Sequence, residues 1–267
     1  MKYKNMYTGF NLEFKRYFTE PQEKYYLDKG KELFKQFSNK VEQKLEELIL
    51  ANGNIDGGKM QSNWFPNVEA DIFLSHSHKN EKEAIALSGY LHDKLGIKTF
   101  IDSCIWGYSN DLLKELDKTF CKRDDGYYDY NKRNFTTSNV HMMLSTALNK
   151  MMDKTECLLF LNTPESISFK EGVKSSTLSP WIYSEIETSK ILRHKRLSEY
   201  RKTRRQTRTF AKGGVMLNES IQYPLDLDHL TTLNTEDIRK WVSEYNNEEF
   251  PLDLLYYQKS KELVFTK

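Results

Sequence analysis

Short apolar runs alternate with helical patterns in the middle of the chain. Residues 69–75 form an apolar run that ends in a polar turn, which predicts a buried parallel strand. Alanine and leucine then recur at helical spacing over 84–95, and Gly96 is the expected C-cap. A second strand is predicted at 97–101. Strand, helix and strand in this order form a βαβ unit, so both strands should be parallel in one sheet.

Polar residues mark where two helices should begin. Asn80, with Glu83 three residues later, fits a capping box. Ser179 followed by Pro180 is typical of an N-cap and the first position of a helix. We therefore expect one helix after each of these caps.

The remaining pattern completes an α/β protein. Helices are predicted at 110–120 and 139–152, and another from Thr235 to about Tyr245, capped by Asn234. Further strands are predicted at 157–161, 213–217 and 223–227. Together these elements predict a flavodoxin-like, doubly wound, five-stranded parallel sheet.

The first 65 residues follow a different pattern. Between residues 22 and 50, apolar residues recur every seven positions among Lys, Glu and Gln, at Leu27, Phe34, Val41 and Leu48. This predicts a long amphipathic helix that needs a partner surface. The run is too short to require a coiled coil, so we expect it to pack on its own domain rather than on a second copy. We therefore divide the chain into a helical N-terminal extension, 1–65, and a main domain, 66–267.

Composition limits the class of protein but does not indicate a binding partner. Forty Lys and Arg against 38 Asp and Glu leave a net charge of +2, so bulk charge favours neither nucleic acid nor an acidic surface. No apolar stretch has the length of a membrane span, and no membrane contact is expected. The three cysteines, Cys104, Cys121 and Cys157, lack the spacing of a metal site or a disulfide framework. They fit a reducing compartment, so we expect a cytoplasmic protein.

The predicted helix at Pro180 carries the strongest candidate for chemistry. Trp181 and Glu185 are four residues apart and share one face of that helix. The helix follows the buried strand 157–161, and ligands of open α/β sheets bind beyond the carboxyl ends of the strands. A core tryptophan beside a solvated glutamate is the structural alternative.

Taken in order, these segments resemble the Toll/interleukin-1 receptor (TIR) domain family over about residues 68–250. The matching pieces are 71–76, 100–102, Trp106 with Gly107 in the family's BB loop, 157–161, and Trp181 with Glu185. The sequence departs from the family at Asn80, where many relatives have an acidic residue, and in an insertion at about 120–136.

The resemblance implies a reaction and its residues. TIR domains either assemble as adaptors or cleave NAD+ at the nicotinamide–ribose bond, and the enzymes carry a glutamate that Glu185 matches. A carboxylate there can stabilise the positive charge that develops on the ribose. NAD+ would be the substrate, and no cofactor is expected. The residues expected to bind the substrate are Trp181, Ser75, His76, Asp102 and Trp106.

The resemblance also implies a biological role. The product would be ADP-ribose or a cyclic ADP-ribose signal, made in bacterial anti-phage defence and sensed by a downstream effector. Copies would self-associate through the BB loop, residues 102–109, where Ile105 and Trp106 are expected to be exposed.

Other functions remain as alternatives. The first is a non-catalytic TIR adaptor that acts only by TIR–TIR assembly. The second is nucleic-acid binding through the basic stretch 193–208, but only Tyr200 and Phe210 could supply stacking, so a solvated surface is the expected reading. His76 and His78 have no further ligand at metal spacing, so no metal is expected. No G-x-G-x-x-G follows the first predicted strand, which disfavours a Rossmann-type cofactor site.

Overall fold

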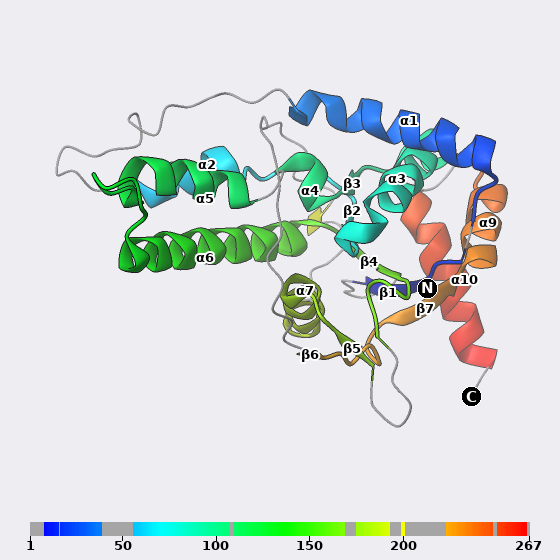
Figure 1. Cartoon of the computed structure of the whole chain (residues 1–267). Helices are drawn as coiled ribbons and strands as arrows, with labels where there is room; N and C mark the ends of the chain where they lie inside the picture. The colour runs from blue at the N-terminus through cyan, green and yellow to red at the C-terminus, as the bar shows by residue number, and fades with distance from the viewer. Residues whose placement is uncertain are drawn as a thin grey trace.

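The computed structural model of the chain describes residues 8–15, 17–38, 56–106, 109–168, 175–192, 199–200, 223–247 and 250–265. Within these ranges, five parallel strands form a central sheet in the order β3-β2-β4-β1-β7 (Figure 1). The strands are β1 (Thr8–Glu13), β2 (Ile72–Ser75), β3 (Thr99–Phe100), β4 (Cys157–Asn162) and β7 (Thr231–Asn234). The predicted α/β class and five-stranded parallel sheet are confirmed.

Strand β1 corrects the prediction of a purely helical N-terminal extension. It lies between β4 and β7 and pairs in parallel with both, with Phe10 opposite Leu159 and Thr231. The side chains of Phe10 and Leu12 are buried in the core. The first 65 residues therefore supply a central strand of the sheet. The prediction failed here because Gly9 and Asn11 interrupt the apolar pattern of this strand.

The edge strand next to β1 is formed by residues that were not predicted to be a strand. The predicted strand 213–217 lies outside the described residues. From 223–227 only β6 (Tyr223–Pro224) forms, and it pairs antiparallel with β5 (Ser176–Thr177) in a separate two-stranded sheet. The edge strand is β7, which runs directly into α9 (Thr235–Glu244). Asn234 caps this helix, as predicted, and forms a capping box with Asp237.

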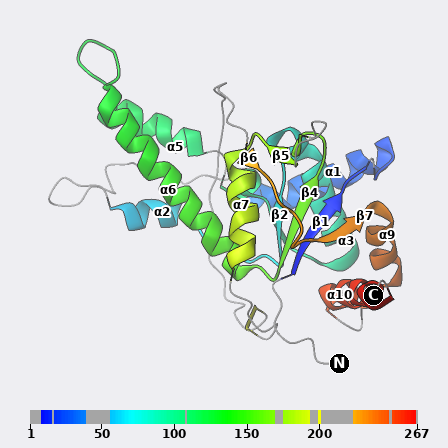
Figure 2. The same ribbon diagram turned by 90° about the horizontal axis from the view of Figure 1, so that it is seen from below.

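Helices cover both faces of the sheet, as Figures 1 and 2 show. Helices α1 (Glu20–Ser38) and α3 (Glu81–Leu95) lie on one side, and α6 (Tyr130–Lys154) and α7 (Pro180–Ile191) lie on the other. The strand order is compatible with the flavodoxin-like order 2-1-3-4-5, with β1 in the fourth position. Strand β1 therefore occupies the sheet position next to β4, where a strand from later in the sequence was expected.

Helix α1 packs closely on α3, as predicted for an N-terminal helix that contacts its own domain. The two helices meet at glycines: a Cβ on Gly89 would collide with the backbone of Tyr26, and one on Gly30 with the backbone of Ile85. Gly96 ends α3 in the left-handed conformation, with φ of 66°, as predicted. Residues 39–50 of the predicted long helix lie outside the described part of the chain.

Four further α-helices complete the described fold, and α5 forms an arm together with α6. They are α2 (Gly57–Trp64), α4 (Asp102–Ile105), α5 (Ser109–Leu116) with a π-helical turn at Asp117–Cys121, and α10 (Pro251–Phe265). Helix α6 begins at Tyr130, so the end of the predicted insertion 120–136 is helical. Helices α5 and α6 extend together beyond the sheet (Figure 2). Arg133 Nε donates to Asp117 Oδ2 at 2.7 Å and joins α6 to that turn.

Candidate functional site

A hydrogen bond joins the end of a central strand to α7. Ser75, the last residue of β2, donates from Oγ to Glu185 Oε2 at 2.6 Å. The Glu185 side chain is buried, with only 6% of the residue exposed. Ser179 accepts a hydrogen bond from Ile182 N at the start of α7, and Pro180 is its first residue, as predicted. The local sequence thus fixes where α7 begins and how its second turn meets the sheet.

This contact lies where the direction of the chain in the sheet reverses. Strand β2 pairs with β3 on one side and with β4 on the other. The chain therefore moves outward from β2 to β3 and then returns past β2 to β4. In open α/β sheets the carboxyl ends of strands at such a switch point form the usual ligand site. The Ser75–Glu185 contact is at that end of β2.

The electrostatic setting of Glu185 disfavours its charged form. Burial, and then the nearby negative charge of Asp102, raise the pKa of Glu185 to about 8, while the hydrogen bond from Ser75 opposes this shift. Asp102 is the first residue of α4, just beyond β3. The charge of Asp102 thus acts on the carboxyl group that α7 contributes.

His76 adds a buried nitrogen that has no hydrogen-bond partner in the described part of the chain. The residue is 8% exposed, and its Nε2 atom makes no hydrogen bond with any described residue. Burial lowers the pKa of His76, and the charge of Asp102 acts in the opposite direction. A buried polar atom left unsatisfied costs about 1–3 kcal/mol, so it calls for an explanation. Ser75, His76, Asp102 and Glu185, four of the expected site residues, are therefore brought together.

The two predicted tryptophans have different roles. Trp181 is half-buried one turn before Glu185, and its ring meets the edge of His141 on α6, with 5.7 Å between the ring centroids. Trp106 is 1% exposed, and its Nε1 donates to Pro66 O at 2.7 Å. The prediction that Trp106 binds substrate is wrong, because its ring is a core group.

The expected apolar surface of the BB loop is also wrong. Ile105 is as deeply buried as Trp106, whose ring packs against Phe65 and Phe100. The physical reason is the short helix α4, which turns these side chains inward against β3. Residues 107 and 108 of this loop lie outside the described residues.

A polar network that the sequence did not predict holds the loop after β2. The Asn80 side chain makes no capping bond to α3, so the predicted capping box is wrong. Its Oδ1 instead accepts a hydrogen bond from Thr163 Oγ1 at 2.6 Å. Ser166 Oγ accepts from Thr163 N and donates to Leu161 O. This network ties the loop after β2 to the loop after β4. Asn80 was visible as a departure from the TIR pattern, but its partner was not.

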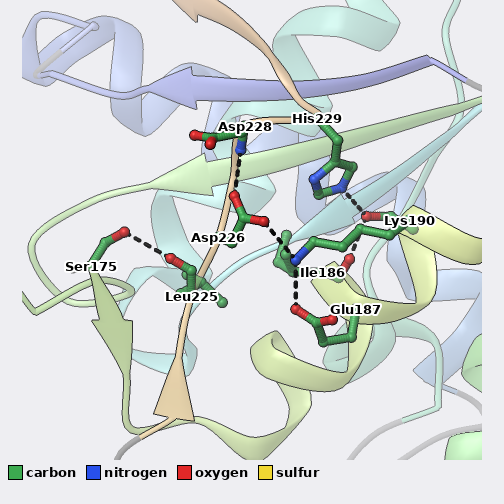
Figure 3. A network of polar contacts seen from close by, with 9 residues as sticks. Ser175, Ile186, Glu187, Lys190, Leu225, Asp226, Asp228 and His229 are labelled. Atoms are coloured by element: carbon green, nitrogen blue, oxygen red, sulfur yellow. Dashed lines mark hydrogen bonds and ion pairs between the residues drawn. The ribbon is translucent and has the colours of Figure 1, made fainter.

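A second network holds the last turns of α7 (Figure 3). Lys190 Nζ lies 2.8 Å from Glu187 Oε1 and 3.2 Å from Asp226 Oδ2. Ser189 Oγ lies 2.7 Å from His229 Nε2. These contacts bind α7 to the segment before β7. This network therefore fixes the position of the helix that carries Glu185.

The described residues contain no group of three His, Cys, Asp or Glu side chains suited to hold a metal ion. No helix in the described ranges is long and apolar enough to span a membrane. Most of the basic stretch 193–208 lies outside the described residues. Comparisons with protein-family models, curated proteins and solved structures gave no match.

Proposed function

We propose that this chain is a TIR-type enzyme that cleaves the nicotinamide–ribose bond of NAD+, with Glu185 as the catalytic residue. The observation that carries the proposal is the buried Glu185 carboxyl group, held by Ser75 at the switch point of the sheet. Burying a carboxyl group beside Asp102 costs stability, and perturbed carboxyl groups of this kind cluster at functional sites. The sequence resemblance supplies the reaction class.

The reaction needs one carboxylate and no obligatory acid. The C–N bond breaks, its electron pair neutralises the departing nicotinamide, and positive charge develops on the ribose. The Glu185 carboxylate stabilises that charge, an interaction that strengthens in the transition state. The cationic ring of NAD+ also favours the ionised form of Glu185, which offsets the raised pKa of that group in the free protein. Half-buried Trp181 offers a ring face for stacking, worth about 1–3 kcal/mol.

The proposed role is signalling in the bacterial cytoplasm. Hydrolysis gives ADP-ribose, and attack by a group within the substrate gives a cyclic ADP-ribose, which a downstream effector would sense in anti-phage defence. The free state of Cys104, Cys121 and Cys157 supports a reducing compartment. Self-association of TIR domains belongs to the same proposal, although it cannot use Ile105 and Trp106 as a docking surface.

A non-catalytic adaptor is the second candidate, and one observation favours it. Tyr127, Tyr130 and Phe135 are highly exposed at the tip of the α5–α6 arm, where aromatic side chains could contact another protein. An adaptor surface, however, does not require a buried carboxyl group such as Glu185. We therefore rank the enzyme first.

Product analysis separates the two candidates. The purified full chain is incubated with NAD+, over a range of protein concentrations, and the products are identified by chromatography and mass spectrometry. The enzyme releases nicotinamide together with ADP-ribose or a cyclic ADP-ribose. NADH is the matched control: its neutral nicotinamide ring is a poor leaving group, so it should persist. Intact NAD+ at every protein concentration would favour the adaptor.

A further inference from the structure

The buried imidazole of His76 directly follows Ser75, the last residue of β2. Glu185 has a hydrogen-bond partner in Ser75, but Nε2 of His76, the residue that follows Ser75, has none within the described ranges, although the residue is more than nine-tenths buried. A polar group of a bound molecule that reaches this depth can satisfy the atom.

Burial sets the resting state of the ring. It lowers the pKa of His76, so the neutral form prevails near neutral pH. A neutral imidazole carries one proton, and in the tautomer protonated at Nδ1 the Nε2 atom keeps its lone pair. In that tautomer the buried Nε2 atom, which has no partner among the described residues, can accept a proton.

The charged neighbours of His76 let it accept a proton during a reaction. Asp102 on α4 and Glu81 at the start of α3 favour the imidazolium form, and His78 in the same loop opposes it. Asp102 also acts on Glu185 of α7. The ring is thus neutral at rest and has acidic groups nearby that stabilise the cation.

We propose that His76 is the general base of this site and takes the proton of the oxygen nucleophile. The proposal rests on NAD+ cleavage as the proposed function. The bond from ribose to nicotinamide breaks and its electron pair leaves with nicotinamide. The oxygen of water, or of a hydroxyl group of the substrate, bonds to the ribose carbon. Its proton passes to Nε2 and then to solvent.

This assignment gives the two buried groups separate tasks. The Glu185 carboxylate acts on the positive charge of the ribose, and its Oε2 is already bound by Ser75. His76 acts on the nucleophile, whose O–H group satisfies the free Nε2 atom. General bases placed in this way typically contribute about 10²–10⁴-fold to the rate.

The test compares wild-type protein with His76→Gln and His76→Phe, and with His92→Gln as a control in an exposed part of α3. We expect kcat for nicotinamide release to fall about 10²-fold or more in both His76 variants, with KM changed little. The deficit should shrink at alkaline pH, because hydroxide then replaces the missing base. His92→Gln should behave as wild type, and circular dichroism checks that each variant is folded.

Each outcome has one reading. Near-wild-type kcat in folded His76→Gln or His76→Phe overturns the assignment of the base while NAD+ cleavage stands. A loss of kcat that is equal at every pH also overturns it, because a misplaced loop would act in that way. If only His76→Gln folds, its pH profile decides alone. If wild-type protein releases no nicotinamide, the proposed function fails, and the base fails with it.

Discussion

The hydroxyl group of Ser75 and the carboxyl group of Glu185 lie 2.6 Å apart, although 110 residues separate them in the chain. One ends a central strand and the other lies on the second turn of α7. Their contact brings together the two sequence segments on which the proposed chemistry depends. The Ser75 hydroxyl group also lowers the pKa of Glu185, so replacing Ser75 should change that pKa without changing Glu185 itself.

That link predicts the pH dependence of the proposed reaction. The pKa of Glu185 is about 8 in the free protein, and the proposed catalytic form is the ionised one, so kcat/KM should rise with pH and level off above about 8. The Ser75 hydrogen bond lowers the pKa of Glu185, so Ser75→Ala should move this limb to higher pH. Nicotinamide release from pH 5 to 10 measures both. A limb near the ordinary glutamate pKa of 4.5 in wild-type protein contradicts the role given to burial.

Folding stability should respond to pH in the opposite direction. Between about 4.5 and 8 the folded protein holds a proton on Glu185 that the unfolded chain has lost, so stability falls as pH rises through this window. Glu185→Gln removes that dependence and should exceed wild type in free energy of unfolding at pH 8–9, by on the order of a few kcal/mol. Urea unfolding at pH 5 and 8.5 measures the difference. Equal pH dependence in the two proteins would show that Glu185 is not buried in this way.

The two tryptophans should separate activity from stability. Trp181→Ala should lower kcat/KM by roughly 5- to 150-fold through lost stacking of about 1–3 kcal/mol, and Trp181→Phe should lose less. Trp106→Ala should instead destabilise the fold by about 3–5 kcal/mol, because a buried indole is removed. Kinetics and thermal unfolding are measured for all three variants. A Trp106→Ala protein with unchanged melting temperature would contradict its place in the core.

The packing of α1 on α3 predicts that glycine substitutions differ sharply. Gly89→Ala places a methyl group against the backbone of Tyr26, so the helices must separate and the melting temperature should fall by several degrees. Gly57→Ala is the matched control, because no described atom lies within 4 Å of the added Cβ at the start of α2. Similar melting temperatures for the two variants would show that the N-terminal helix does not dock here.

The central part of the fold was predictable because its pattern is local. Periodic leucines and Gly96 marked α3, and an unbroken apolar run marked β4. Strand β1 was not, because Gly9 and Asn11 interrupt its apolar pattern and only its pairing with β4 and β7 makes it a strand. Residues close in the sequence give a helix its period, whereas strand order depends on distant partners.

In the candidate site, too, positions on a single helix were predictable from the sequence, whereas contacts between distant segments were not. Helical spacing and an N-cap placed Glu185 on a helix that begins at Pro180. Whether Trp106 faces the site or the core depends on how α4 turns, and no sequence pattern fixed that. The bond from Thr163 to Asn80 joins two loops 83 residues apart, so only the folded chain reveals it.

The catalytic role of Glu185 is tested by nicotinamide release from NAD+ by wild-type protein, Glu185→Gln and Glu187→Gln. Glu187 lies two residues further along α7 and forms an ion pair with Lys190, so its replacement makes the same chemical change away from Ser75. We predict release by wild-type protein and by Glu187→Gln, and a loss of about 10²-fold or more in folded Glu185→Gln. Wild-type rates in Glu185→Gln, or equal losses in the two variants, would contradict the catalytic role of Glu185.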